Sequence, residues 1–225
     1  MRLVVPLLLV SMASSAWAAG PAASGTATSS AATSAGAPAS AGAAQRTRGF
    51  FLSQTCAFCH GVKDYVIPYP TRHVPLIGGQ HAKYIRDALK EYAEGHRKFP
   101  TMNAQASSLT QKQIHDIAAY ISGLAPNPPP TNGNQKAPPF AASCAACHGA
   151  RGVSTNPEYP SLAGQYEDYL LLALKEYKSG KRKNAIMNGE ASGLTLAQMK
   201  RLAHYFGSRE KTPLGLLPLN GPIKN

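Results

Sequence analysis

The sequence Cys56-Ala57-Phe58-Cys59-His60 occurs a second time, 88 residues further along, as Cys144-Ala145-Ala146-Cys147-His148. The similarity continues downstream, because residues 75–124 align with residues 160–209 and share Lys-Glu-Tyr and Met-Asn at equivalent positions. Self-similarity at a fixed offset indicates repeated copies of one structural unit. The sequence therefore predicts two homologous domains, each carrying one Cys-x-x-Cys-His motif.

A proline-rich segment separates the two copies. Residues 125–139 contain six prolines, which lack the backbone N–H that a helix requires and favour an extended chain. We therefore place the N-terminal domain at residues 46–124, a linker at 125–139 and the C-terminal domain at 140–212. Residues 213–225 are left as a C-terminal tail.

Hydrophobic periodicity predicts three helices in each copy and no strand, so the expected fold class is all-α. The first helix should cover Thr47–His60 and Phe140–Gly149, and the second should begin near Gln80 and Gln165. The third opens with a capping box, a Thr followed three residues later by a Gln that caps it in return. These boxes and the apolar faces behind them comprise Thr110, Gln113, Ile114, Ile117, Ala118 and Ile121 in one copy, and Thr195, Gln198, Met199, Leu202, Ala203 and Phe206 in the other.

Three helices with so much Pro and Gly between them make a thin core, and the Cys motif predicts what fills it. Cys-x-x-Cys-His is the attachment sequence of a c-type haem. On one helical turn the two thiols reach the two vinyl groups of a porphyrin edge, and the imidazole is directed at the iron. A zinc site would need the two Cys pairs about 15 to 20 residues apart, and a disulfide or thiol redox pair would leave His60 and His148 unexplained. We therefore expect two covalent haems, held by Cys56 with Cys59 and by Cys144 with Cys147.

The second axial ligand of each iron decides between a carrier and a catalyst, since an iron with both positions filled cannot bind a substrate. Met102 and Met187 occupy equivalent positions in what we expect to be loops between the second and third helices. They are the predicted partners of His60 and His148. Among the other histidines only His73 competes for the first iron. His/Met ligation favours a high reduction potential and outer-sphere transfer of one electron per haem.

With these motifs the chain resembles the dihaem class I cytochromes c of bacteria, most closely the cytochrome c₄ family. The resemblance covers about residues 46–210 and rests on residues 144–149, 160–165, 175–183 and Met187, with weaker counterparts in the first copy. It implies that the carbonyls of Pro75 and Pro160 accept a hydrogen bond from Nδ1 of the haem-ligating histidines. It also implies two haems that face each other across the domain interface.

The resemblance further implies a periplasmic carrier that links a quinol-oxidising cytochrome complex to a terminal oxidase or reductase, with no enzymatic activity and no small-molecule substrate. An electron-transfer subunit of an oxidoreductase, such as a flavoprotein sulfide dehydrogenase, is the alternative. A dihaem peroxidase or a thiosulfate-oxidising cytochrome would require an open iron. The sequence departs from the family at residues 62–74, where a Gly-rich turn is usual.

The N-terminus predicts export. Residues 1–18 combine one basic residue, an apolar run and Ala16-Trp17-Ala18, which is typical of a secretory signal cleaved after Ala18 and favours a periplasmic location. Residues 19–45 consist almost entirely of Ala, Ser, Gly, Thr and Pro. Such a segment has no large apolar side chain to bury, so we expect a disordered tether.

The chain is basic, with 23 Lys and Arg against 11 Asp and Glu. The positive charges are spread over both copies without a long basic run, which argues against nucleic acid as a partner. They would suit docking onto an acidic face of a membrane respiratory complex, or peripheral association with an anionic membrane. Arg97-Lys98 and Lys181-Arg182-Lys183 recur just before each Met, and we expect them on the surface near the haems.

Overall fold

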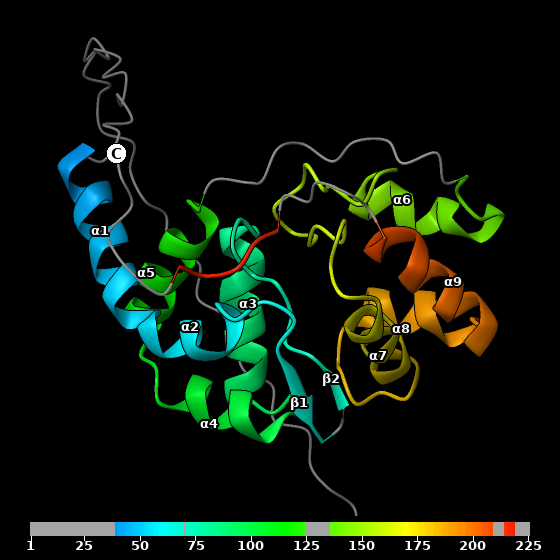
Figure 1. Ribbon diagram of the computed structural model, residues 1–225, viewed down its shortest axis with the longest axis horizontal. Helices are drawn as coiled ribbons and strands as arrows, with labels where there is room; N and C mark the ends of the chain where they lie inside the picture. Colours follow the sequence, from blue (N-terminus) through cyan, green and yellow to red (C-terminus); the bar gives the residue numbers. More distant parts are fainter. Residues whose placement is uncertain (1–38, 70, 125–135, 209–213, 219–225) are drawn as a thin grey trace, which may run out of the picture. The chain divides into compact units, whose positions relative to one another are not determined.

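The computed structural model describes residues 39–69, 71–124, 136–208 and 214–218. Helices dominate this part of the chain, which confirms the predicted all-α class (Figure 1). No helix in the described residues is long and apolar enough to cross a membrane. The predicted signal sequence, residues 19–38 of the tether and residues 125–135 of the linker lie outside the described residues. The elements are α1 (Ala39–Leu52), α2 (Gln54–His60), α3 (Ala82–Ala93), α4 (Pro100–Ser107), α5 (Gln111–Ser122), η1 (Pro139–Ala141), α6 (Ala142–His148), α7 (Glu167–Lys178), α8 (Ala185–Ser192) and α9 (Leu196–Gly207), with the short strands β1 (Val66–Pro68) and β2 (Thr71–His73).

The two copies of the sequence repeat show the same packing of helices. In the N-terminal half α3 packs against α4 and α5, and in the C-terminal half α7 packs against α8 and α9. The apolar faces predicted behind the capping boxes are buried. Both boxes are present: the Thr110 hydroxyl accepts from the backbone N–H of Gln113, and the Thr195 hydroxyl accepts from that of Gln198.

Both copies contain a helix that we did not predict, and the first helix predicted over Thr47–His60 is divided at Ser53 into α1 and α2. The segments expected to be loops around Met102 and Met187 are the two-turn helices α4 and α8. Pro100 stands in the first turn of α4, where its missing N–H costs nothing. Asn184 caps α8 by accepting from the backbone N–H of Met187 at 3.0 Å. Neither segment has a clear apolar periodicity, because each helix has only eight residues and buries a single alanine, Ala106 in α4 and Ala191 in α8.

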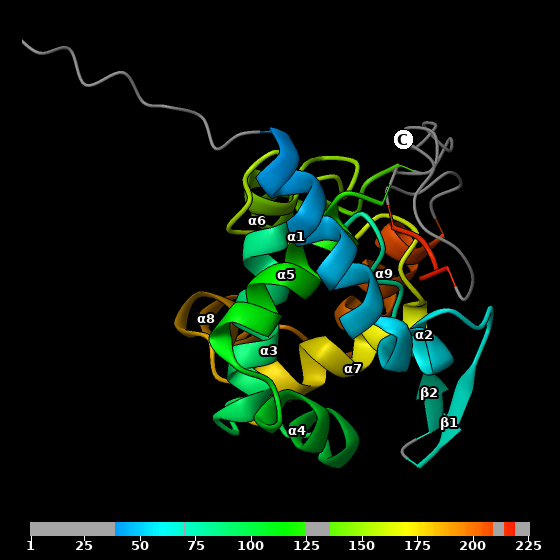
Figure 2. The same ribbon diagram turned by 90° about the vertical axis from the view of Figure 1, so that its left-hand side faces the viewer.

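Helix α1 begins at Ala39, so the tether prediction was wrong for residues 39–45. Alanine has the highest intrinsic helix propensity, and tertiary packing extends the helix upstream. Figures 1 and 2 show α1 beside α5, the element against which it packs. Gly49 permits the close approach, since a Cβ there would lie 2.0 Å from the carbonyl oxygen of Asp116.

The prediction of no strand was also wrong. β1 and β2 form an antiparallel hairpin in which Val66 pairs with His73 and Pro68 with Thr71. The hairpin lies in the segment where the sequence departs from the family pattern, and strands of three residues are too short to show an alternation. Residues 214–218, predicted as part of a tail, pack back onto the N-terminal half, where Leu217 joins the core cluster that contains Ile117 and Ile121.

An ion-pair network joins α1 to α5, and we expect it to make stability depend on pH. Arg48 and Lys112 each lie 2.9 Å from the Asp116 carboxylate, and their hydrogen bonds hold the pKa of Asp116 below its ordinary value. The stabilisation is therefore complete above about pH 4 and is lost as the pH falls through the lowered pKa. Both cations are substantially exposed, so Asp116→Asn should cost about 1 kcal/mol or less at pH 7.

Thermal unfolding at pH 7 and at pH 2 to 3 checks this prediction. The difference between wild type and Asp116→Asn should shrink at the lower pH, because the wild-type carboxyl then becomes neutral as well. Glu94→Gln serves as the control, since Glu94 pairs with Lys90 on the surface at 3.8 Å. An Asp116→Asn effect that is the same at both pH values would contradict the assignment.

Candidate haem-binding site

The two Cys-x-x-Cys-His motifs occupy equivalent short helices. Cys56, Cys59 and His60 lie on α2, and the second motif lies on α6. In both helices the histidine is the last residue, so the ring projects from the C-terminal end. All four cysteines are free and half-buried. Each half therefore presents two thiols and one imidazole from a single short helix.

The two histidines have the same hydrogen-bond partner in each half. Nδ1 of His60 lies 2.8 Å from the carbonyl oxygen of Pro75, and Nδ1 of His148 lies 2.8 Å from that of Pro160. A carbonyl only accepts, so each Nδ1 carries the proton and each Nε2 keeps a free lone pair. Burial lowers the pKa of both imidazoles, partly offset by the proline carbonyls. Neutral imidazoles in this tautomer are ready to ligate a metal through Nε2.

One continuous cavity of about 510 Å³ runs between the two motifs and is lined mostly by apolar side chains. Cys59, His60 and Met102 line it from the N-terminal half, and Cys147, His148 and Met187 line it from the C-terminal half. Its size and apolar lining suit large flat ligands. The two thiols, one imidazole and one thioether of each half are the donor set that a His/Met-ligated c-type haem needs. The residues present therefore fit two haems.

An asparagine after each methionine fixes the helix that carries it. The side-chain Nδ2 of Asn103 donates to the carbonyl oxygens of Tyr92 and Arg97, and its Oδ1 accepts from the backbone N–H of Phe99. Asn188 makes the equivalent three bonds in the C-terminal half. These amides tie the start of α4 and α8 to the end of the preceding helix. Sequence reasoning missed this role, although the Met-Asn pair is identical in both copies.

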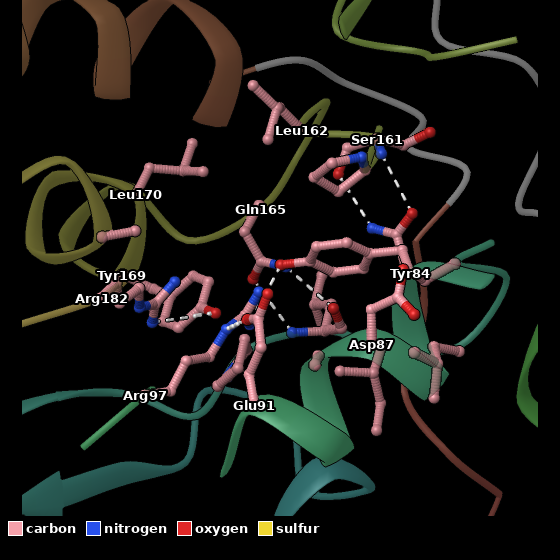
Figure 3. A pocket seen from close by; sticks show the side chains of 18 of the residues that line it. Tyr84, Asp87, Glu91, Arg97, Ser161, Leu162, Gln165, Tyr169, Leu170 and Arg182 are labelled. Atoms are coloured by element: carbon pink, nitrogen blue, oxygen red, sulfur yellow. Dashed lines mark hydrogen bonds and ion pairs between the residues drawn. The ribbon is translucent and has the colours of Figure 1, made fainter. Parts of the chain in front are cut away.

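Two arginines that we predicted on the surface are buried in the cavity wall. Arg97 pairs with Glu91, and Arg182 pairs with Glu176 at 2.8 Å, with each arginine side chain only 4% exposed. Their guanidinium groups also lie over tyrosine rings, as the cation–π contact between Arg182 and Tyr169 shows. Figure 3 shows Arg97 beside Glu91 and Arg182 beside Tyr169 in the pocket. Guanidinium groups in such positions suit the carboxylates of a ligand. Only the neighbouring Lys98, Lys181 and Lys183 are exposed, as predicted.

The β hairpin adds a second buried cation to the N-terminal half, which is the third in the cavity wall. Arg72 on β2 is 5% exposed and lines the cavity, with its guanidinium 4.3 Å from the centre of the Phe99 ring. Its Nε is buried without a hydrogen-bond partner among the described residues. The sequence could not reveal this residue, because the hairpin segment has no counterpart in the second copy.

The structure places His73, the competing ligand for the first iron, away from the cavity lining. Its ring stacks on Tyr166 with centroids 4.5 Å apart, and its Nδ1 lies 2.9 Å from the Asp168 carboxylate. His73 therefore contacts the C-terminal half through α7. Met199, which we assigned to the core rather than to a metal, is 2% exposed on α9.

Comparison with known proteins supports the conclusion that the chain binds one haem in each half. The model of the cytochrome c family matches residues 44–125 and 138–209, once in each half. The chain is 30% identical over 192 residues to cytochrome c-552 of Acidithiobacillus ferridurans, covering 76% of this chain and 80% of that protein. It is 27% identical to a thiosulfate dehydrogenase electron acceptor of Thiomonas intermedia, covering 71% of this chain and 80% of that protein. The solved structure of cytochrome c4 from Acidithiobacillus ferrooxidans superposes with a TM-score of 0.56 at 30% identity, covering 69% of this chain and 99% of that one.

The repeated Cys-x-x-Cys-His helices, the shared cavity and the two family matches agree with one another. Each half supplies the covalent attachment residues of one haem, and the solved cytochrome c4 structure shares the tandem arrangement. The chain belongs to the cytochrome c family as a dihaem electron-transfer protein of the cytochrome c4 type, with two covalently bound c-type haems.

Proposed function

We propose that this protein is a periplasmic carrier that passes single electrons from a quinol-oxidising cytochrome complex to a terminal oxidase or reductase. One observation supports this most strongly: a histidine and a methionine line the same cavity in each half. With His60 and Met102 on one iron and His148 and Met187 on the other, neither haem has a free position for a substrate. Bound haem would supply a one-electron couple, and one histidine and one methionine of each half would hold its iron.

The residues around the irons support a high potential. Thioether sulfur is a weaker donor than imidazole and favours the ferrous state. The mostly apolar lining of the cavity also disfavours the extra charge of the ferric state. Such a couple suits a carrier late in a respiratory chain. The predicted signal sequence at residues 1–18 supports export to the periplasm, where the carrier would meet membrane complexes.

The relatives favour a second candidate partner. One of them is named a thiosulfate dehydrogenase electron acceptor and is matched over 80% of its length. Another relative, matched over 31% of this chain, is named a cytochrome subunit of sulfide dehydrogenase. The second candidate is therefore an electron-accepting partner or subunit of a dehydrogenase that oxidises sulfur compounds.

An optical spectrum with a redox titration of the purified protein tests the carrier proposal. We expect two haems per chain, a weak band near the red edge from methionine bound to ferric iron, and no reaction of the ferrous protein with peroxide. Rapid peroxide reduction, or the absence of the methionine band, would overturn the proposal. Detection of the protein in the periplasmic fraction, with its N-terminus close to Ala19, tests the location.

Purification from the native host separates the two candidates. A freely diffusing carrier should purify alone and be reduced rapidly by the membrane quinol-oxidising complex. A dehydrogenase partner should co-purify with a larger catalytic chain and be reduced when thiosulfate or sulfide is added to that complex. Reduction by the dehydrogenase alone would select the second candidate.

A further inference from the structure

Two buried glutamines bind backbone groups of the opposite half of the protein. Oε1 of Gln80 accepts from the backbone N–H of Ser161 at 3.0 Å, and Nε2 of Gln80 donates to the carbonyl oxygen of Ser161 at 3.0 Å. The side chain is 4% exposed. Because a backbone N–H must face the oxygen and a carbonyl must face the NH₂ group, these two bonds fix the orientation of the amide.

Gln165 makes the equivalent contact in the opposite direction, from the C-terminal half to the N-terminal half. Its Oε1 accepts from the backbone N–H of Leu76 at 3.0 Å, and its Nε2 donates to the carbonyl oxygen of Leu76 at 2.8 Å. Both glutamines follow a glycine with a positive φ, 78° at Gly79 and 70° at Gly164. The turns that aim the two amides across the interface are therefore the same in both halves. Figure 3 shows Gln165 and Ser161 in the pocket wall.

The peptide groups whose N–H donates to the glutamine oxygens also hold the haem-ligating histidines. The N–H of Ser161 and the carbonyl of Pro160 belong to one peptide unit, and that carbonyl accepts from Nδ1 of His148 at 2.8 Å. A continuous hydrogen-bonded chain therefore runs from Gln80 through this peptide to His148. The equivalent chain runs from Gln165 through the Pro75–Leu76 peptide to His60.

We infer that Gln80 and Gln165 are positioning residues that tune the reduction potential of the haem in the opposite half. An N–H that donates a hydrogen bond polarises its peptide group and makes the carbonyl of the same peptide a stronger acceptor. A stronger bond from Nδ1 to that carbonyl makes the imidazole a better electron donor, which favours ferric iron and lowers the potential. Each half thereby sets the potential of the other through its glutamine.

The inference rests on His60 and His148 as haem ligands and on the dihaem family, not on the electron partners or methionine ligands of the proposed function. A wild-type spectrum without the methionine band would contradict the proposed function and would leave the following test intact. The structural requirement is only that the two halves stay in contact through the glutamine amides.

The test uses the holoprotein and a readout that reports each haem separately. Potentials are measured by titration followed through the hyperfine-shifted NMR signals of each haem, together with the solvent exchange of the two histidine Nδ1 protons. Gln80→Leu should raise the potential of the haem held by Cys144 and Cys147 and speed the exchange of the His148 proton. The other haem and His60 should be unchanged. Gln165→Leu should give the reverse pattern.

Tyr166→Phe is the matched control. Tyr166 follows Gln165 and also bonds across the interface, through its hydroxyl to the backbone N–H and carboxylate of Asp64, but it has no hydrogen bond to the Pro75–Leu76 peptide. Its removal should leave both potentials and both exchange rates unchanged. Should Gln80→Leu fail to fold, Gln80→Asn keeps a polar amide that is one methylene too short for both bonds. A shift in the haem of the mutated half, an equal shift in both haems, or no shift in either would overturn the inference.

Discussion

Met187→Ala is expected to lower the potential of the haem held by Cys144 and Cys147 by tenths of a volt, within the range of about 0.8 V that axial ligands span. Met187 lines the haem cavity on α8, and Asn184 and Asn188 fix the start of that helix. Removing the thioether leaves a position for water or another harder donor, which favours the ferric state. The red-edge band should fall to half its wild-type intensity, because the other haem keeps its methionine.

Met102→Ala should produce the same loss at the other haem, and the double variant should lose the band entirely. Both variants should also acquire reactivity toward peroxide or carbon monoxide, since an axial position has opened. Met199→Leu is the matched control, because Met199 is a buried methionine of α9 and the swap nearly conserves volume. It should cost less than about 1.5 kcal/mol of stability and leave both potentials unchanged. A full red-edge band in Met187→Ala would show that another group is the ligand.

The features that sequence predicted well are those set by local chemistry. The Cys-x-x-Cys-His motifs, the capping boxes at Thr110 and Thr195 and the apolar faces behind them each depend on residues within one or two helical turns. Their recurrence in two copies makes chance an inadequate explanation. For this reason the fold class and the haem attachment could be inferred before the structure was known.

Features that depend on distant partners could not be predicted in this way. Helix α4 forms because the amide of Asn103 binds the end of α3, and no apolar period marks that helix. The sequence predicts Arg97 as a surface charge, because nothing in its own segment indicates that Glu91 and two tyrosine rings surround it. The repeat did mark both residues as identical between copies, but identity alone does not indicate a partner.

The same limit applies to the contacts between the halves. Gln80 and Gln165 were recognised as equivalent positions, yet their partners lie 81 and 89 residues away in sequence. The hairpin had no second copy to support it, and residues 214–218 follow the last repeat altogether. The glutamine contacts, the hairpin and residues 214–218 either join the two halves or cover one of them. They are therefore the ones for which a structure was required.

The segment 214–218 supplies the second large expected effect, which concerns stability. Leu217 is 2% exposed in the core cluster of the N-terminal half, and its backbone N–H donates to the carbonyl oxygen of His60 at 3.0 Å. Gly215 exchanges two backbone hydrogen bonds with Gly78, each 2.9 Å long. A segment that follows α9 therefore completes the core of the N-terminal half behind His60.

Leu217→Ala should destabilise the protein by about 2–5 kcal/mol, the usual cost of truncating a buried leucine, and a chain that stops at residue 213 should lose at least as much. Leu216→Ala is the matched control, because the neighbouring Leu216 is 37% exposed and should cost little. Thermal unfolding of the holoprotein, followed through signals of each haem, measures both effects. The haem held by Cys56 and Cys59 should report unfolding first, since the lost contacts are to α2 and the core cluster beside it. Equal costs for Leu216→Ala and Leu217→Ala, or earlier unfolding at the other haem, would mean that these residues do not complete the N-terminal core.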